Sequence, residues 1–177
     1  MAGSLFFCAA KLKPNKTLED LSIANDSKSM SKKKRTALYE KLIDIVDYKF
    51  VEIYPEFIDD EGLSEACRYS LHYLKRKFQN DKILYDGKTT FKVDGIETLV
   101  KADAKVSIVA AASIIAKTLK DKNMEEWAER FPEYDFENNA GYGTKKHIEA
   151  IKKYGYTIIH RRSFNIKALK NNLEKDK

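Results

Sequence analysis

The feature that most constrains the fold is a continuous apolar run near the start of the chain, Leu5 to Ala10. Apolar residues in unbroken succession, followed by Pro14, are typical of a β-strand with both faces buried, because a half-exposed strand would alternate apolar and polar residues. We therefore expect this segment to be a strand that neighbouring elements cover on both faces.

Further strand patterns follow along the chain. The segments expected to be strands are Lys49 to Tyr54, closed by Pro55, then Ile83 to Tyr85 and Thr98 to Lys101. The Asp94-Gly95 pair is a hairpin signal that leads into the last of them. A hairpin here would lie between two acids that each follow a strand, Asp86 and Asp103.

Helical patterns alternate with these strands. Apolar spacing and capping residues predict helices after Ser31, after Ser64, from Ile108 to Leu119, and from Thr144 to Gly155. The alternation predicts an α/β sheet with a helical C-terminal part. A doubly wound parallel fold is the alternative, although no Gly-x-Gly-x-x-Gly or Walker-type loop follows a strand.

Composition limits the class of protein. The 177 residues are 43% hydrophobic and 34% charged, which is enough for one domain over residues 1–177 with a charged tail at 165–177. A net charge of +6 favours an anionic partner such as nucleic acid. Cys8 and Cys67 are expected to be core thiols in a reducing compartment. No apolar run approaches the roughly 20 residues of a membrane span, so we expect a soluble cytoplasmic protein.

Asp86 and Asp103 are the candidate metal-binding acids. Each follows a predicted strand, where open α/β sheets bind ligands. Ordinary structural roles are also open to them, because Asp86-Gly87 is a common turn pair and Asp103 precedes a helix that it could cap. Hard cations such as magnesium take carboxylate oxygens, but two aspartates are too few for a two-metal site.

Other catalytic classes fit the sequence poorly. The three histidines, His72, His147 and His160, share no metal-ligand spacing with each other or with a cysteine, which disfavours zinc. Ser113 lies within an alanine-rich helix, where we expect it to be buried and bonded to its own backbone.

Two segments are suited to nucleic acid. Gly141-Tyr142-Gly143 places an aromatic ring on a loop before a lysine-rich helix start, a geometry for stacking beside phosphates, although a loop tyrosine packed on the core is the alternative. His160-Arg161-Arg162 offers guanidinium forks suited to phosphate, and it could equally be a surface edge.

Taken in order, these segments resemble ribonuclease HII from Met1 to about Phe164. The matching segments are Asn25-Asp26-Ser27-Lys28, Ser31 to Arg35, Asp86-Gly87, Lys101-Ala102-Asp103, Ala111 to Lys117, Gly141 to Thr144, and His160 to Phe164. The resemblance implies a ribonuclease H-like mixed sheet flanked by helices. It also implies a monomeric endonuclease that uses Mn²⁺ or Mg²⁺ to cut the RNA strand of RNA–DNA hybrids and single ribonucleotides in duplex DNA.

By the same resemblance, Asp86 and Asp103 are the catalytic, metal-binding acids, and Tyr142 packs against the sugar at the RNA–DNA junction. Lys28, Lys117 and Arg161 would contact phosphates. Each of these roles is an expectation from the family.

The sequence departs from the family at its start. The family opens with a strand that carries Asp-Glu and then Ala-Gly-Arg-Gly, whereas Met1-Ala2-Gly3 matches only the Leu-Ala-Gly just beyond it. Half of the acidic tetrad is therefore absent, and we expect the chain to be inactive as given. We expect a start codon placed too far downstream, or a truncated gene, of a working ribonuclease HII, with a genuine shortened protein as the alternative. A non-catalytic nucleic-acid-binding module is the alternative function. The absent strand is expected between the Leu5 and Ile83 strands, so both would have exposed apolar edges.

Overall fold

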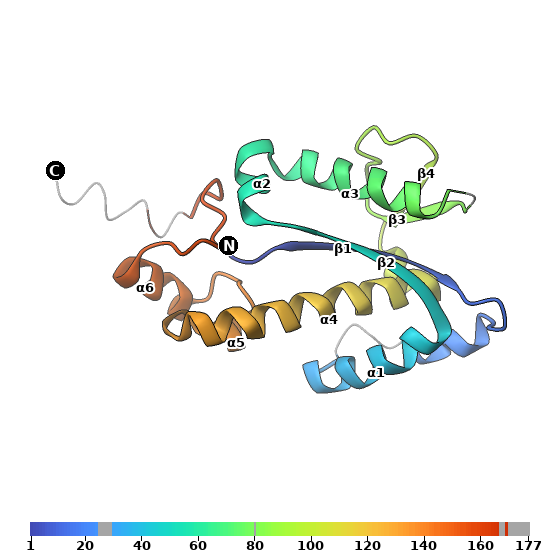
Figure 1. The fold of residues 1–177 in the computed structure, drawn as a ribbon, viewed down its shortest axis with the longest axis horizontal. Helices are drawn as coiled ribbons and strands as arrows, with labels where there is room; N and C mark the ends of the chain where they lie inside the picture. Colours follow the sequence, from blue (N-terminus) through green and yellow to red (C-terminus); the bar gives the residue numbers. More distant parts are fainter. Residues whose placement is uncertain (25–29, 80, 167–168, 170–177) are drawn as a thin grey trace. The chain divides into compact units, whose positions relative to one another are not determined.

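The computed structural model describes residues 1–24, 30–79, 81–166 and 169 (Figure 1). The chain divides into two compact units, and each is described by itself. We call residues 6–52 and 64–119 the sheet unit, and residues 1–5, 53–63 and 120–177 the helical unit.

The described strands form two separate two-stranded sheets. Strand β1 (Leu5–Leu12) pairs with β2 (Val46–Ile53), and β3 (Ile83–Asp86) pairs with β4 (Ile96–Leu99). Strands β3 and β4 run parallel, so their carboxyl ends meet at the same edge. That edge is the one that carries Asp86, opposite Leu99.

The parallel pairing shows that the predicted hairpin is wrong. The Asp94-Gly95 pair lies in the connection between β3 and β4, not at the tip of an antiparallel turn. Val93 in this connection is buried with Leu71 of helix α3 (Leu63–Lys77), and Lys75 donates a hydrogen bond to the Asp94 carbonyl. These contacts hold the connection against the helix, so that β4 runs alongside β3 in the same direction.

The apolar run at the start of the chain is a strand, as predicted, but its expected burial on both faces is wrong. Its residues Leu5 to Ala10 are only half-buried. Among the strands that the structure describes, β1 has β2 as its sole neighbour. The other edge of β1 is therefore open, which leaves its apolar side chains in partial contact with solvent.

The main core of the sheet unit lies between helices. Ser31 caps helix α1 (Lys32–Ile45) as predicted, accepting a hydrogen bond from the Lys34 amide. A short 3-10 helix, η1 (Glu19–Ala24), packs with α1 and with the first half of α4 (Ser107–Arg130). The buried residues of this cluster are Leu21, Ala24, Leu38, Leu42, Ile45, Val46, Ala110, Ala111, Ile114 and Ile115.

The helical unit combines α2 (Pro55–Glu61), the second half of α4, η4 (Pro132–Tyr134), α5 (Phe136–Asn139) and α6 (Lys145–Tyr154). Thr144 caps α6 and Gly155 ends it, as the sequence predicts. The buried core residues are Ala2, Met124, Tyr134, Phe136, Ala150, Ile151 and Ile159. Within the described part of the chain, no helix is both long and apolar enough to cross a bilayer.

Candidate active site and nucleic-acid interface

Asp86 and the residue before Asp103 are joined by a hydrogen bond. Asp86 is the last residue of β3, and the chain leaves β4 through Lys101, whose φ of 57° turns it into the 3-10 helix η3 (Ala102–Ala104). The Ala102 amide donates to Asp86 Oδ1 at 3.0 Å. The parallel pairing and this hydrogen bond therefore bring the two predicted acids to the same edge of the sheet.

The carboxylate oxygens at this edge are suitable ligands for a hard cation, but only two carboxylates lie there among the described residues. Asp86 is exposed and Asp103 is half-buried, so solvent reaches both residues. Carboxylate oxygens are the ligands that Mg²⁺ and Mn²⁺ prefer. Among the described residues, no group of three or more His, Cys, Asp or Glu side chains is placed to hold a metal ion. The pair fits part of a metal site.

The turn after Asp86 is shaped by an aromatic cluster. A Cβ at Gly87 would overlap the Tyr85 ring, so glycine is required here by side-chain packing. Tyr85 stacks on Phe7 of β1 with ring centroids 5.9 Å apart and meets Phe91 edge-on. Burial, with smaller contributions from Cys67 and Asp86, raises the pKa of Tyr85. Tyr85 therefore serves as a neutral packing residue that holds the turn.

In the helical unit, Tyr142 projects from a tightly bonded loop. Its side chain is 62% exposed, which contradicts the alternative that it packs on the core. Gly141 has a φ of +80°, and a Cβ there would overlap the Ala2 carbonyl. The Asn139 side chain accepts from the Gly141 amide at 2.8 Å and donates to the Tyr134 carbonyl at 2.7 Å. The backbone that presents Tyr142 is therefore fixed.

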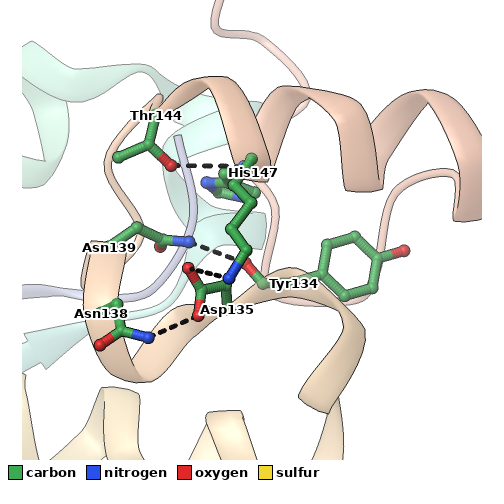
Figure 2. A network of polar contacts seen from close by, with 7 residues as sticks. Tyr134, Asp135, Asn138, Asn139, Thr144 and His147 are labelled. Atoms are coloured by element: carbon green, nitrogen blue, oxygen red, sulfur yellow. Dashed lines mark hydrogen bonds and ion pairs between the residues drawn. The ribbon is translucent and has the colours of Figure 1, made fainter.

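Figure 2 shows the rest of this network, which we call the loop network: Tyr134, Asp135, Asn138, Asn139, Thr144 and His147. The Asn138 side chain donates to Asp135 at 2.6 Å, and the Thr144 hydroxyl accepts from the His147 amide. Lys146 pairs with Asp135 at 3.4 Å. The hydrogen bond from Asn138, followed by the charge and hydrogen bond of Lys146, lowers the pKa of Asp135.

Two buried histidines support the Tyr142 carbonyl. His160 Nδ1 accepts from the Thr157 amide at 2.9 Å, so its Nε2 carries the proton and donates to His147 Nε2 at 3.0 Å. His147 Nδ1 then donates to the Tyr142 carbonyl at 2.8 Å. Burial, followed by the neighbouring His147, lowers the pKa of His160 to about 4, and burial also lowers that of His147. Both rings are neutral links in one chain.

A lysine lies beside the exposed ring of Tyr142. The Lys120 ammonium lies 4.2 Å from the ring centroid, a cation–π contact. Aromatic stacking beside positive charge is the arrangement used to bind single-stranded nucleic acid.

The Arg161 side chain makes contacts within the protein. Its Nε donates to the Gly3 carbonyl at 3.0 Å, and its guanidinium lies 5.2 Å from the centre of the Phe164 ring. Asp59 of α2 accepts from the Arg162 and Ser163 amides and from the Ser163 hydroxyl. Burial alone would raise the pKa of Asp59, but these hydrogen bonds outweigh it and lower the pKa. The basic motif is thus held as a defined turn.

The remaining predicted residues have mixed outcomes. Lys117 is exposed on α4 in the sheet unit, and its phosphate contact stays a prediction. Lys28 lies outside the described residues. Ser113 was expected to be buried, but it is exposed.

Sequence reasoning missed Lys120, Asp59 and the histidine pair. Lys120 follows Lys117 on the same helix and could have been found from that spacing. Asp59 and the histidine pair act through partners distant in sequence, so no local signal marks them.

A family model described as Ribonuclease HII matches residues 1–167. The chain belongs to the ribonuclease HII family. Its similarity to curated members runs over most of both chains. It is 43% identical over 169 residues to ribonuclease HII of Sulfurovum sp. strain NBC37-1, covering 96% of this chain and 87% of that protein. Against ribonuclease HII of Campylobacter hominis it is 45% identical, covering 98% and 92%. The chain is by family a ribonuclease H-type endoribonuclease.

Solved structures confirm the ribonuclease H-like fold class. The ribonuclease HII chain from the Archaeoglobus fulgidus complex with PCNA superposes with a TM-score of 0.76 at 20% identity, covering 91% of this chain and 86% of that one. Ribonuclease H2 from Pyrococcus horikoshii gives 0.66 at 23% identity, with 97% and 99% covered. A Bst ribonuclease HIII structure in complex with Mn²⁺ gives 0.62 at 15% identity, with 100% and 72% covered.

Proposed function

We propose that Asp86 and Asp103 are the metal-binding acids of an endonuclease that cuts RNA strands of RNA–DNA hybrids and single ribonucleotides in duplex DNA. The observation that carries the proposal is the 3.0 Å hydrogen bond from the Ala102 amide to Asp86, which joins the end of β3 to the residue before Asp103. Carboxylates at the carboxyl ends of neighbouring parallel strands are well placed to share a cation.

The reaction divides between the ion and the protein. A bound Mg²⁺ or Mn²⁺ supplies a water of lowered pKa and offsets charge at the phosphate. Asp86 and Asp103 hold and orient the metal ion. The amide of Ala102 fixes the direction of the Asp86 carboxylate. Tyr142 stacks against the sugar at the RNA–DNA junction. Lys28, Lys117 and Arg161 contact phosphates, and Lys120 joins them because its ammonium lies beside Tyr142.

We further propose that residues 1–177 alone cleave poorly. Two-metal hydrolysis of a phosphodiester uses ions about 4 Å apart, which needs more carboxylates than one pair. The part of the chain that the structure describes offers no cluster of three metal-binding side chains. The same shortage favours a second candidate, a non-catalytic nucleic-acid-binding module that uses the Tyr142 surface.

One experiment separates the two candidates. A strand that carries the family's Asp-Glu and Ala-Gly-Arg-Gly is fused before Met1, and cleavage of a duplex containing one ribonucleotide is measured with Mn²⁺. The nuclease proposal predicts metal-dependent cleavage by the fusion, its loss in Asp86→Asn, and no Asp86-dependent cleavage by the unfused chain. Hybrid binding without any cleavage by a folded fusion would support the binding module instead.

A matched control keeps the result specific to the site. Asp94→Asn removes an exposed carboxylate from the connection between β3 and β4, and the fusion should retain its cleavage. If Asp94→Asn and Asp86→Asn reduced cleavage equally, the assignment of Asp86 would be wrong.

A further inference from the structure

The helical unit contains a cleft of about 360 Å³ beside the end of helix α6. We call it the tyrosine cleft, because aromatic side chains make up most of its wall. The wall residues that matter here are Phe131, Tyr134, Tyr154, Tyr156, Ile158 and Arg162. Figure 2 shows the Tyr134 ring extending away from the Asn138 and Asn139 side chains of the loop network. The cleft is therefore a feature separate from the loop that presents Tyr142.

The rings of the tyrosine cleft are inclined to one another. Tyr134 is buried, and its hydroxyl donates a hydrogen bond to the Gly155 carbonyl at 2.7 Å, which fixes the ring in place. Its ring plane makes an angle of 84° with that of Phe131 and 54° with that of Tyr154. Rings at such angles enclose a hollow and do not offer one flat face. The hollow suits a bulky apolar side chain better than a stacked nucleic-acid base.

The rim of the cleft exposes apolar surface to solvent. The Ile158 side chain is 73% exposed, and the Tyr154 and Tyr156 side chains are exposed as well. Exposed apolar groups that gather around a hollow are typical of surfaces that bind another protein. Burial of this surface against a partner would remove it from water, which favours association.

The charges at the cleft favour an anionic partner. The Arg162 amide donates to Asp59 at 2.8 Å, so the backbone of this residue is fixed. Its guanidinium lines the cleft and forms no ion pair with the residues that the structure describes. The Lys153 ammonium lies 4.8 Å from the centre of the Tyr154 ring. Against these two cations the wall contains the acid Glu133.

We propose that the tyrosine cleft binds an acidic segment of a partner protein. An aromatic side chain of the segment enters the hollow, and a neighbouring carboxylate pairs with Arg162. The planar guanidinium of arginine matches a carboxylate through two parallel hydrogen bonds. Tyrosine and arginine are also the residues that most often contribute strongly to protein interfaces. This inference concerns partner binding and does not depend on the proposed catalysis.

Single-stranded nucleic acid fits the cleft less well. Binding of a strand uses a groove of cations that follows the phosphates, together with open ring faces for successive bases. Here the cations are Arg162 and Lys153, and Lys153 already covers one face of Tyr154. The tyrosine cleft therefore differs from the surface around Tyr142, which exposes a single ring on a loop.

The test titrates the full chain into the fluorescein-labelled peptide Glu-Asp-Phe-Asp-Glu and measures fluorescence anisotropy. Replacing the phenylalanine of the peptide by serine should weaken binding at least tenfold, and so should replacing both aspartates by asparagine. Equal binding of the serine peptide would reduce the effect to attraction between opposite charges and would overturn the proposal. No binding of the original peptide up to about 1 mM would overturn it too.

Variants of the chain locate the binding. Arg162→Gln and Ile158→Ser should each weaken peptide binding at least tenfold, and both side chains are exposed, so the fold should persist. Lys145→Gln removes the same charge in the first turn of α6, at the opposite end of that helix from Tyr154, and should leave binding unchanged. Leu63→Ser, at another exposed apolar residue of the helical unit, should also have no effect. Unchanged binding in both cleft variants would overturn the proposal.

Two further outcomes would assign the cleft to another occupant. Displacement of the bound peptide by an unlabelled oligothymidylate would overturn the peptide proposal in favour of a nucleic-acid site. Self-association of the chain that is lost in Ile158→Ser would overturn it in favour of a second copy of the chain.

Discussion

The loop that presents Tyr142 and the edge that presents Asp86 differ in how completely they are built. The Tyr142 loop is held by the side chain of Asn139, a helix cap and a chain of two histidines. At the carboxyl edge of β3, by contrast, Asp86 accepts one backbone hydrogen bond from the described residues and borders a cavity of about 520 Å³ in the sheet unit. The comparison shows that nearby polar contacts fix the Tyr142 loop, whereas the position of the acid pair depends on the pairing of strands β3 and β4.

The largest effect is expected in the core beneath the Tyr142 loop. Phe136 is fully buried and meets His147 and His160 at centroid distances of 5.2 and 5.8 Å. Phe136→Ala should lower the free energy of unfolding by about 3–5 kcal/mol, because it removes a large buried ring and leaves a cavity. Urea unfolding followed by fluorescence of Trp127, which packs against this core, measures the loss.

A matched change in the sheet unit sharpens the contrast. Phe7→Ala removes a half-buried ring that borders the cavity of the sheet unit, so its cost in unfolding free energy should be well below that of Phe136→Ala. Equal costs would mean that the open edge is packed as tightly as the loop core.

The histidine pair predicts an acid-sensitive loop. The pKa of His160 is about 4 in the folded chain against 6.5 for the free side chain, so the unfolded chain binds protons first as pH falls. Above pH 6.5 the neutral ring therefore contributes about 3 kcal/mol to the free energy of unfolding. This contribution is lost progressively as the pH falls from 6.5 to 4. Unfolding free energies measured across that range test it.

His160→Gln should flatten this pH dependence, and His72→Gln, at an exposed position, should leave it unchanged. A slope that persists in His160→Gln would show that other groups cause the acid sensitivity.

Adding a large side chain should destabilise the protein by different amounts on the two sides of α4. Ala111 is fully buried in the core between the helices, whereas Ala112 borders the cavity of the sheet unit. Ala111→Phe should cost about 1–3 kcal/mol because surrounding side chains must shift. Ala112→Phe should cost less than Ala111→Phe, since the added ring enters open space. Urea unfolding of both variants checks the order, and a larger cost for Ala112→Phe would contradict the open space beside Ala112.

The smallest effect is expected at the helix cap of the Tyr142 loop. Thr144→Ala removes the oxygen that accepts from the His147 amide and should cost about 1 kcal/mol. Thr144→Ser keeps the oxygen and should cost less. Thermal unfolding of the two variants measures the difference, and equal losses would show that the cap contributes little.

Local signals in the sequence predicted the parts of the fold that depend on neighbouring residues. The caps at Ser31 and Thr144 and the end of α6 at Gly155 were correct, because each acts within one turn of helix. The family resemblance also predicted that Asp86 and Asp103 bind metal together. The structure places both at the carboxyl edge of β3 and β4, and their metal binding stays a prediction.

The errors come from contacts between residues distant in sequence. Asp94-Gly95 signals a turn, but the direction of β4 is set by packing of Val93 on α3. Burial of β1 depends on a neighbouring strand, which no pattern within Leu5–Ala10 can report. Local composition therefore predicts where strands occur better than how they are covered.

The central claim is that Asp86 and Asp103 bind one divalent cation, and a Mn²⁺ titration followed by electron paramagnetic resonance tests it most directly. The account predicts a bound ion whose affinity falls at least tenfold in Asp86→Asn and in Asp103→Asn, and is unchanged in Asp94→Asn. Binding that is absent in the unsubstituted chain, or equal in all three variants, would contradict it.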